Sequence, residues 1–227
     1  MADYAGATTG KSSSKIESMT LVPDLLAFVA AAMVVIVTPG MDTALVLRTA
    51  AVEGPRRGLQ AAAGIALGCL AWGASVALGL GAILVASHTA YTIVKLAGAA
   101  YLAWLGLGML IRPRETLMPA AGAVRGGGAF GALRRGLTSN LLNPKAGVFY
   151  VSFLPMFVPR GYPVAPFLFG LCLIHVILGV AWLSFLAGAT VPLGRVLSER
   201  GVVRVLDRVT GTVFLAFSAR LVLSERT

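Results

Sequence analysis

Six long apolar stretches dominate this sequence and limit the folds open to it. Each is close to the roughly 20 residues that an α-helix needs to cross about 30 Å of hydrocarbon. The chain is 57% hydrophobic and only 12% charged, which is typical of an integral membrane protein rather than a soluble domain. We therefore expect an all-α membrane protein with six transmembrane helices, in the segments Leu21–Leu47, Leu59–Ala86, Thr89–Ile111, Leu137–Val158, Val164–Val191 and Val202–Leu223.

The net charge of +10 indicates membrane topology rather than nucleic-acid binding. If the six helices alternate in direction, most arginines fall in the loops of one side, which is the positive-inside pattern of cytoplasmic loops. Both termini are then predicted to lie outside, and the partner is the lipid bilayer, with no nucleic acid. The cytoplasmic side would receive Arg48, Arg56, Arg57, Arg112, Arg114, Arg125, Arg134, Arg135, Arg195, Arg200, Arg204 and Arg208, against Lys11, Lys15, Arg160, Arg220 and Arg226 on the other.

A polar segment divides the chain into two halves. Residues 112–136, "RPRETLMPAAGAVRGGGAFGALRRG", are rich in Gly, Arg and Pro, which predicts a cytoplasmic linker between three-helix repeats at 21–111 and 137–227. Residues 1–20 are polar and lack the apolar core of a signal peptide, so we expect a disordered N-terminal extension. Since "MTLVPDLLAF" would make an ordinary start, we expect the natural chain to begin at Met19.

The two halves repeat the same pattern of helix breaks. Thr38-Pro39-Gly40 interrupts the first span, and Asn143-Pro144-Lys145 interrupts the fourth. The spacing that aligns Pro39 with Pro144 is close to the spacing that aligns Cys69 with Cys172. Because each half has an odd number of spans, the second half enters the membrane upside down. The pattern thus predicts two inverted three-helix repeats, the plan of many secondary transporters.

A proline within a span frees a backbone carbonyl. Pro39 has no N–H for the carbonyl of Val35, and Pro144 has none for that of Asn140. Exposed backbone groups cost several kcal/mol each in lipid unless protein, water or a ligand satisfies them. We therefore expect each break to face an interior cavity.

The first break also carries a carboxylate, and ionisable groups within spans are functional by default. The helix that restarts at Met41 presents free N–H groups that suit an anion, while freed carbonyls suit a cation. Such a site is complementary to a zwitterionic amino acid. Asp42 is the only carboxylate deep within these spans, and Lys145 is predicted to pair with it, to hold a substrate carboxylate, or to reach the interface. The predicted substrate-binding residues are Thr38, Pro39, Gly40, Asp42, Thr43, Asn143, Pro144 and Lys145.

A histidine, a glycine pair and the two cysteines also bear on function. His175 lies mid-span, where an imidazole can carry a proton, so Asp42 and His175 are the predicted proton-coupling residues. Gly64 and Gly68 form GxxxG, which lets another helix approach closely, either within the chain or in a homodimer. The two cysteines lack metal-ligand spacing, so no metal or cofactor is expected.

Four segments in order resemble the LysE/RhtB family of bacterial amino-acid exporters, over Leu21 to about Leu223. They are "TPGMDTALVLRTAAVEGPRRGLQAAAGIALG", "KLAGAAYLAWLGLGMLIRP", "LRRGLTSNLLNPKAGVFYVSFLPMFV" and "LDRVTGTVFLAFSARLVL". Met41 stands where that family often has a second proline, and Asp42 stands where many members have Asn. The resemblance implies a multi-pass exporter of amino acids in the bacterial inner membrane, driven by proton antiport.

Two other function classes remain as alternatives. An exporter of a metal or other inorganic ion would use the same architecture but needs several hard oxygen, His or thiolate ligands. An intramembrane enzyme is not expected, because the chain has two histidines, no HExxH and no nucleophile-base spacing.

Overall fold

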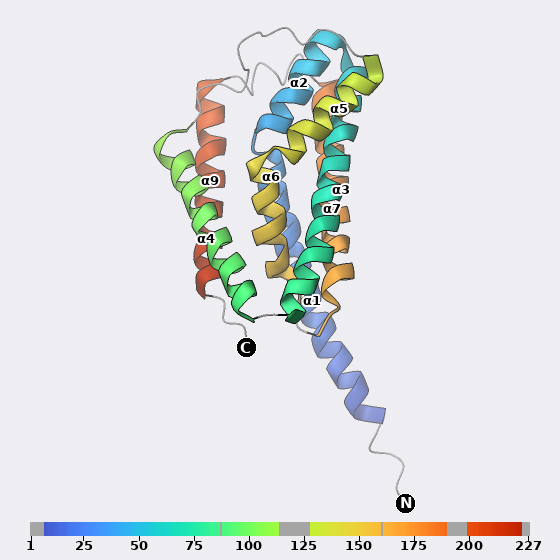
Figure 1. Ribbon diagram of the computed structural model, residues 1–227, viewed down its shortest axis with the longest axis vertical. Coiled ribbons are helices and arrows are strands. Elements are labelled where there is room, and N and C mark those ends of the chain that lie inside the picture. The colour runs from blue at the N-terminus through green and yellow to red at the C-terminus, as the bar shows by residue number, and fades with distance from the viewer. Residues whose placement is uncertain (1–6, 87, 114–127, 160, 190–198, 224–227) are drawn as a thin grey trace, which may run out of the picture.

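The computed structural model describes residues 7–86, 88–113, 128–159, 161–189 and 199–223. Every regular element in these ranges is a helix, so the predicted all-α class is confirmed. In chain order (Figure 1) the elements are α1 (Ala7–Val37), α2 (Met41–Glu53), α3 (Pro55–Ala86), α4 (His88–Ile111), α5 (Gly128–Leu141), α6 (Pro144–Val148), a π-helical turn (Phe149–Phe153), a 3-10 turn (Leu154–Phe157), α7 (Val164–Gly188) and α9 (Arg200–Leu223).

Up to three candidate membrane spans lie within the described residues. Pro55–Gly79 of α3 and Val164–Gly188 of α7 are each long and apolar enough. Val22–Val37 and Met41–Glu53 satisfy the same criterion as a pair bent by 52°, and Leu96–Ile111 is apolar but shorter. The arrangement of six spans in two inverted repeats therefore remains a prediction, since the predicted fourth span is divided among α5, α6 and two short turns.

Two predicted boundaries differ from the helix ends. Residues 7–20, expected to be disordered, form the first part of α1, which extends away from the other helices (Figure 1). Helix elongation adds one hydrogen bond for each residue fixed, so an apolar helix can extend into polar sequence. Helix α5 begins at Gly128, within the predicted linker, and residues 114–127 of that linker lie outside the described residues.

Glycines allow close contact between α3 and α5. A Cβ atom on Gly64 would lie 1.9 Å from the carbonyl oxygen of Leu133, and one on Gly136 would lie 2.0 Å from that of Ala61. Backbone atoms cannot move aside as a flexible side chain can, so these positions need glycine. The predicted GxxxG contact is thus made within the chain: Gly64 packs against α5, and Gly68 packs against the side chain of Asn140.

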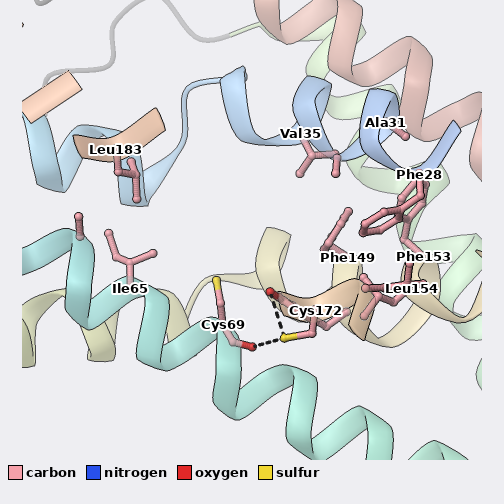
Figure 2. Close-up of a cluster of buried hydrophobic side chains, with 14 of the residues drawn as sticks. Phe28, Ala31, Val35, Ile65, Cys69, Phe149, Phe153, Leu154, Cys172 and Leu183 are labelled. Carbon is pink, nitrogen blue, oxygen red and sulfur yellow. Dashed lines mark hydrogen bonds between the residues drawn. The ribbon is translucent and has the colours of Figure 1, made fainter. Parts of the chain in front are cut away.

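Helix pairs join the two halves of the chain. Helix α3 packs on α7, and α4 packs on α9, with each pair antiparallel (Figure 1). The thiol of Cys172 on α7 donates to the carbonyl oxygen of Cys69 on α3 at 3.6 Å (Figure 2). On the other pair, Gly106 and Gly211 approach each other's carbonyl oxygens reciprocally. Residues that the repeat would make equivalent therefore meet each other in both pairs.

Aromatic side chains pack α1 against the π-helical and 3-10 turns. The Phe28 ring lies 6.5 Å from that of Phe149 and 5.3 Å from that of Phe157, and Phe153 stacks on Phe149 (Figure 2). All four are buried. This cluster fixes the position of the turn that follows the second helix break.

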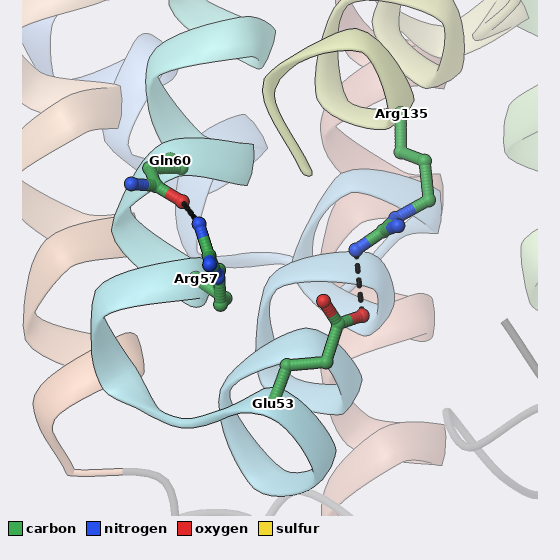
Figure 3. A network of polar contacts seen from close by, with 4 residues as sticks. All are labelled: Glu53, Arg57, Gln60 and Arg135. Atoms are coloured by element: carbon green, nitrogen blue, oxygen red, sulfur yellow. Dashed lines mark hydrogen bonds and ion pairs between the residues drawn. The ribbon is translucent and has the colours of Figure 1, made fainter. Parts of the chain in front are cut away.

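A salt bridge ties α2 to α5 at the Arg-rich end of the molecule. The Arg135 guanidinium donates to Glu53 at 2.6 Å, and nearby Arg57 donates to Gln60 at 2.9 Å (Figure 3). Both partners of the salt bridge are largely shielded from the surface. The pair links the first half of the chain to the second.

Candidate functional site

The first break has the geometry that its sequence predicts. Helix α1 ends at Val37, and Gly40 is extended, with φ −148° and ψ −167°, before α2 begins at Met41. The first bond of α2 runs from the Ala44 N–H to the Gly40 carbonyl at 2.9 Å. The N–H groups of the three residues before Ala44 therefore have no acceptor within the helix.

The helix that follows the second break is capped by the asparagine of that break. Helix α5 ends at Leu141, and α6 begins at Pro144, a first helical position that suits proline because no N–H is needed there. Asn143 is the N-cap, and its side-chain oxygen accepts from the Lys145 N–H at 3.0 Å. The residue before each proline lies outside the helices, because a following proline disfavours helical backbone angles.

Lys145 satisfies the carbonyls that the first break leaves open. Its ammonium donates to the carbonyl oxygen of Val35 at 2.7 Å and to that of Thr38 at 3.0 Å. Val35 is the carbonyl that Pro39 deprives of its helical partner, and a cation suits the C-terminal end of a helix. The second half of the chain therefore supplies the cap of α1.

The corresponding carbonyl of the second break is also paired. The Asn140 carbonyl oxygen accepts from the Asn143 N–H at 3.0 Å and from the indole N–H of Trp72 at 3.4 Å. Both proline-freed carbonyls are thus satisfied by other parts of the protein.

Asp42 accepts hydrogen bonds from three side chains of the second half. The amides of Asn140 and Asn143 donate to one carboxylate oxygen at 2.8 and 3.1 Å, and the Ser139 hydroxyl donates to the other at 3.1 Å. Sequence reasoning missed Ser139 and Asn140. Both residues lie in the last turn of α5, and only the packing of α5 against α2 brings them to Asp42.

A cavity of ≈ 80 Å³ lies beside the two breaks. It brings together six of the eight predicted binding residues and the predicted proton-coupling His175. Pro39 and Pro144 are not among its lining residues. Its polar lining is Thr38, Asp42, Thr43, Asn140, Asn143, Lys145, His175 and Trp182, and its apolar wall includes Val35, Ile36, Val176, Val180 and Leu183.

His175 is held by aromatic residues of the π-helical turn. Its Nδ1 lies 2.8 Å from the Tyr150 hydroxyl, and its ring lies 4.4 Å from the ring of Phe149. Both His175 and Tyr150 are buried. This hydrogen bond links the His175 imidazole to Tyr150 rather than directly to Asp42.

Helix α9 adds two polar features. The hydroxyls of Thr38 and Thr210 are hydrogen-bonded to each other, which joins the first break to α9. Asp207, also on α9, is 1% exposed, so this carboxylate is more deeply buried than that of Asp42, which is half-buried. Hydropathy alone does not reveal which face of an amphipathic helix a charged residue occupies.

A comparison with known families matches residues 33–225 to one described as LysE type translocator. This match covers most of the chain. The protein belongs to the LysE type translocator family. The predicted family and its transport class are therefore confirmed, and this is a family of membrane proteins and translocators rather than of enzymes.

Individual relatives align along nearly their whole length. The chain is 30% identical to a leucine efflux protein of Klebsiella pneumoniae over 201 residues, which are 86% of this chain and 93% of the relative. It is 28% identical to the threonine efflux protein of Escherichia coli K12, over 88% of this chain and 100% of the relative. An uncharacterized membrane protein of Bacillus subtilis, YrhP, is 28% identical over 88% of this chain and 99% of its own. No solved structure matches.

Within the described residues, no group of three or more His, Cys, Asp or Glu side chains lies together as a metal site requires. Cys69 and Cys172 are both buried and free.

Proposed function

We propose that this LysE-family protein is a secondary transporter that exports amino acids across the bacterial cytoplasmic membrane. The observation that carries the proposal is the meeting of the two helix breaks, with Asp42 and Lys145 beside one cavity. Relatives named for leucine and threonine efflux support a neutral amino acid as the substrate.

A zwitterion suits the charges around this cavity. The N-terminal turn of α2 and the Lys145 ammonium favour the substrate carboxylate, and Asp42 favours its ammonium group. Thr38, Thr43 and Asn143 add polar groups to the same lining. Pro39 and Pro144 then act by ending the helices rather than by touching the substrate. The apolar wall suits a side chain without charge, because burying an unpaired charge is costly.

Reciprocal contacts between the halves support the inverted repeat. At the spacing that aligns Pro39 with Pro144, Val35 and Thr38 correspond to Asn140 and Asn143. Lys145 reaches the first pair of residues, and Asp42 reaches the second pair. Each half-helix thus sends a charged side chain from its first turn onto equivalent positions of the other half.

Proton antiport with alternating access completes the proposal. Asp42 and His175 line the same cavity, so either can exchange a proton where substrate binds. Movement of one half against the other would separate Asp42 from the amides of Asn140 and Asn143 and open the site to the opposite side.

The proposed orientation has the Arg-rich turns in the cytoplasm and both termini in the periplasm. The turn between α2 and α3, the start of α5 and the start of α9 lie at one end of the molecule (Figure 1). The first turn of α1 and the last turn of α9 lie at the other end. This separation supports the positive-inside assignment.

Efflux from proteoliposomes tests the proposal. Each labelled amino acid is loaded singly, and its release is followed with and without an imposed pH gradient. We expect gradient-driven release of one or more neutral amino acids. Loss of pH coupling in Asp42→Asn or in His175→Gln would identify the proton carrier. If no amino acid leaves under either condition, the proposal is wrong, and inorganic ions become the cargo to test.

A further inference from the structure

A second cavity, which is more open to the outside than the first, lies across α6 from it. Its volume is ≈ 480 Å³, against ≈ 80 Å³ for the first cavity. On α6 and the π-helical turn it is lined by Pro144, Gly147, Val148, Val151 and Ser152, whereas the first cavity is lined by Lys145, Ala146 and Phe149. Asn143 lines both, so its side chain forms part of the partition between them.

The lining of the second cavity is apolar and aromatic. Trp72 of α3, Tyr101 of α4, Leu141 and Leu142 are among its lining residues, and none of its described lining residues is charged. A charged side chain entering this cavity would lose water without gaining an ionic partner. The cavity therefore suits an apolar group attached to a polar one that stays near Asn143.

The second cavity is the counterpart of the first under the repeat. At the spacing that aligns Pro39 with Pro144, its residues Leu141, Asn143, Gly147 and Val148 correspond to Ile36, Thr38, Asp42 and Thr43 of the first cavity. At the spacing that aligns Cys69 with Cys172, Trp72 corresponds to His175. Equivalent residues of the two halves thus line two different cavities, one for each half.

The two cavities also differ in their distance from the Arg-rich end. On α3, the first cavity is lined by Ala62 to Cys69, near the start of the helix, while the second is lined by Trp72. After the second break, the first cavity reaches Phe149 and the second reaches Ser152. The second cavity therefore extends toward the end where α1 begins.

We propose that the second cavity is the outer half of the permeation path, and that it receives the apolar side chain of a neutral amino acid. The solute passes from the first cavity when the hydrogen bond from Asn143 to Asp42 opens. The inference rests on the proposed function and adds to it a second binding site and a selection against charged side chains.

Two matched alanines on α4 test this assignment. Ala97 lines the second cavity, whereas Ala100 lines neither cavity, and both are exposed in the structure. Filling the cavity with Ala97→Trp is expected to slow efflux of leucine or phenylalanine roughly ten-fold or more. Glycine efflux should change less, because its side chain needs no room. Ala100→Trp should transport both at the native rate.

A milder pair avoids any failure of folding. Ala97→Cys and Ala100→Cys are each treated with a thiol reagent after their transport has been measured, and the untreated and treated native chain controls for Cys69 and Cys172. Modification should block leucine efflux only in Ala97→Cys, and leucine should slow that modification more than glycine does.

The outcomes separate the two proposals. If native protein transports leucine but modified Ala97→Cys does so equally well, and leucine gives no protection, the second cavity is not on the path and is filled by lipid. If native protein transports no amino acid, the proposed function itself fails.

Discussion

Lys145 has a structural role that its position in the sequence does not reveal. From the sequence, Lys145 is predicted to pair with Asp42, to hold a substrate carboxylate, or to reach the interface. In the structure its ammonium caps two carbonyls at the broken end of α1. Lys145 thus belongs to the second break but stabilises the first. The site therefore depends on both halves of the chain.

Replacing Lys145 by methionine should destabilise the folded protein. The carbonyls of Val35 and Thr38 would lose a charged donor, and an unsatisfied buried group costs about 1–3 kcal/mol. The thermal midpoint of purified protein should fall by about 2 °C or more. Arg134→Met, which removes an exposed cation from α5, serves as control. Equal midpoints for the two variants would contradict the capping role.

The candidate site was only partly predictable at the level of residues. Pro39, Gly40 and Pro144 mark their breaks in any sequence, because their backbone limits do not depend on neighbours. The donors to Asp42 do depend on neighbours. Ser139 and Asn140 became visible only when α5 was placed against α2, since a single sequence does not state which helix faces meet.

At the scale of elements, glycine decides which helices lie closest. Helix α3 carries Gly64 against the backbone of α5, and the same α5 carries Gly136 against the backbone of α3. This contact positions Ser139 and Asn140 for Asp42, so helix packing and site geometry are linked. The GxxxG pattern predicted a close helix neighbour correctly but left its identity open.

Gly64→Ala should lower both the folded yield and the thermal midpoint. Its Cβ would lie 1.9 Å from the Leu133 carbonyl oxygen, so α3 and α5 must separate. Gly79→Ala on the same helix has no heavy atom within 4 Å of the new Cβ and is the matched control. It should be neutral or slightly stabilising, because alanine favours helix over glycine by about 1 kcal/mol. A midpoint for Gly64→Ala equal to that of Gly79→Ala would show that the contact is not close in the membrane.

At the scale of the whole molecule, the two halves interlock rather than simply stand side by side. The salt bridge between Glu53 and Arg135, the thiol contact between α3 and α7, and the crossed contacts of Asp42 and Lys145 all join one half to the other. The sequence predicted two matching halves from their breaks. It did not predict that α5 starts at Gly128, because a stretch rich in Gly has low intrinsic helix preference.

The proposed topology makes a separate prediction. Alkaline phosphatase fused after Thr227 should be active, since it folds only outside the cytoplasm, and green fluorescent protein fused at the same place should be dark. The same two reporters inserted between residues 114 and 127 should give the opposite result. Reversed activities at the two positions would overturn the positive-inside assignment.

The central claim is that the two helix breaks together form the transport site, and a pair of carboxylate variants on α2 tests it most directly. Asp42→Ala and Glu53→Ala each remove one carboxylate from the same helix, but only Asp42 lines the cavity beside the breaks. Efflux of labelled leucine and threonine from proteoliposomes should fall roughly a hundred-fold in Asp42→Ala, because Ser139, Asn140 and Asn143 lose the carboxylate that accepts their hydrogen bonds. Efflux by Glu53→Ala should stay close to native. Native rates in a folded Asp42→Ala protein would contradict the account.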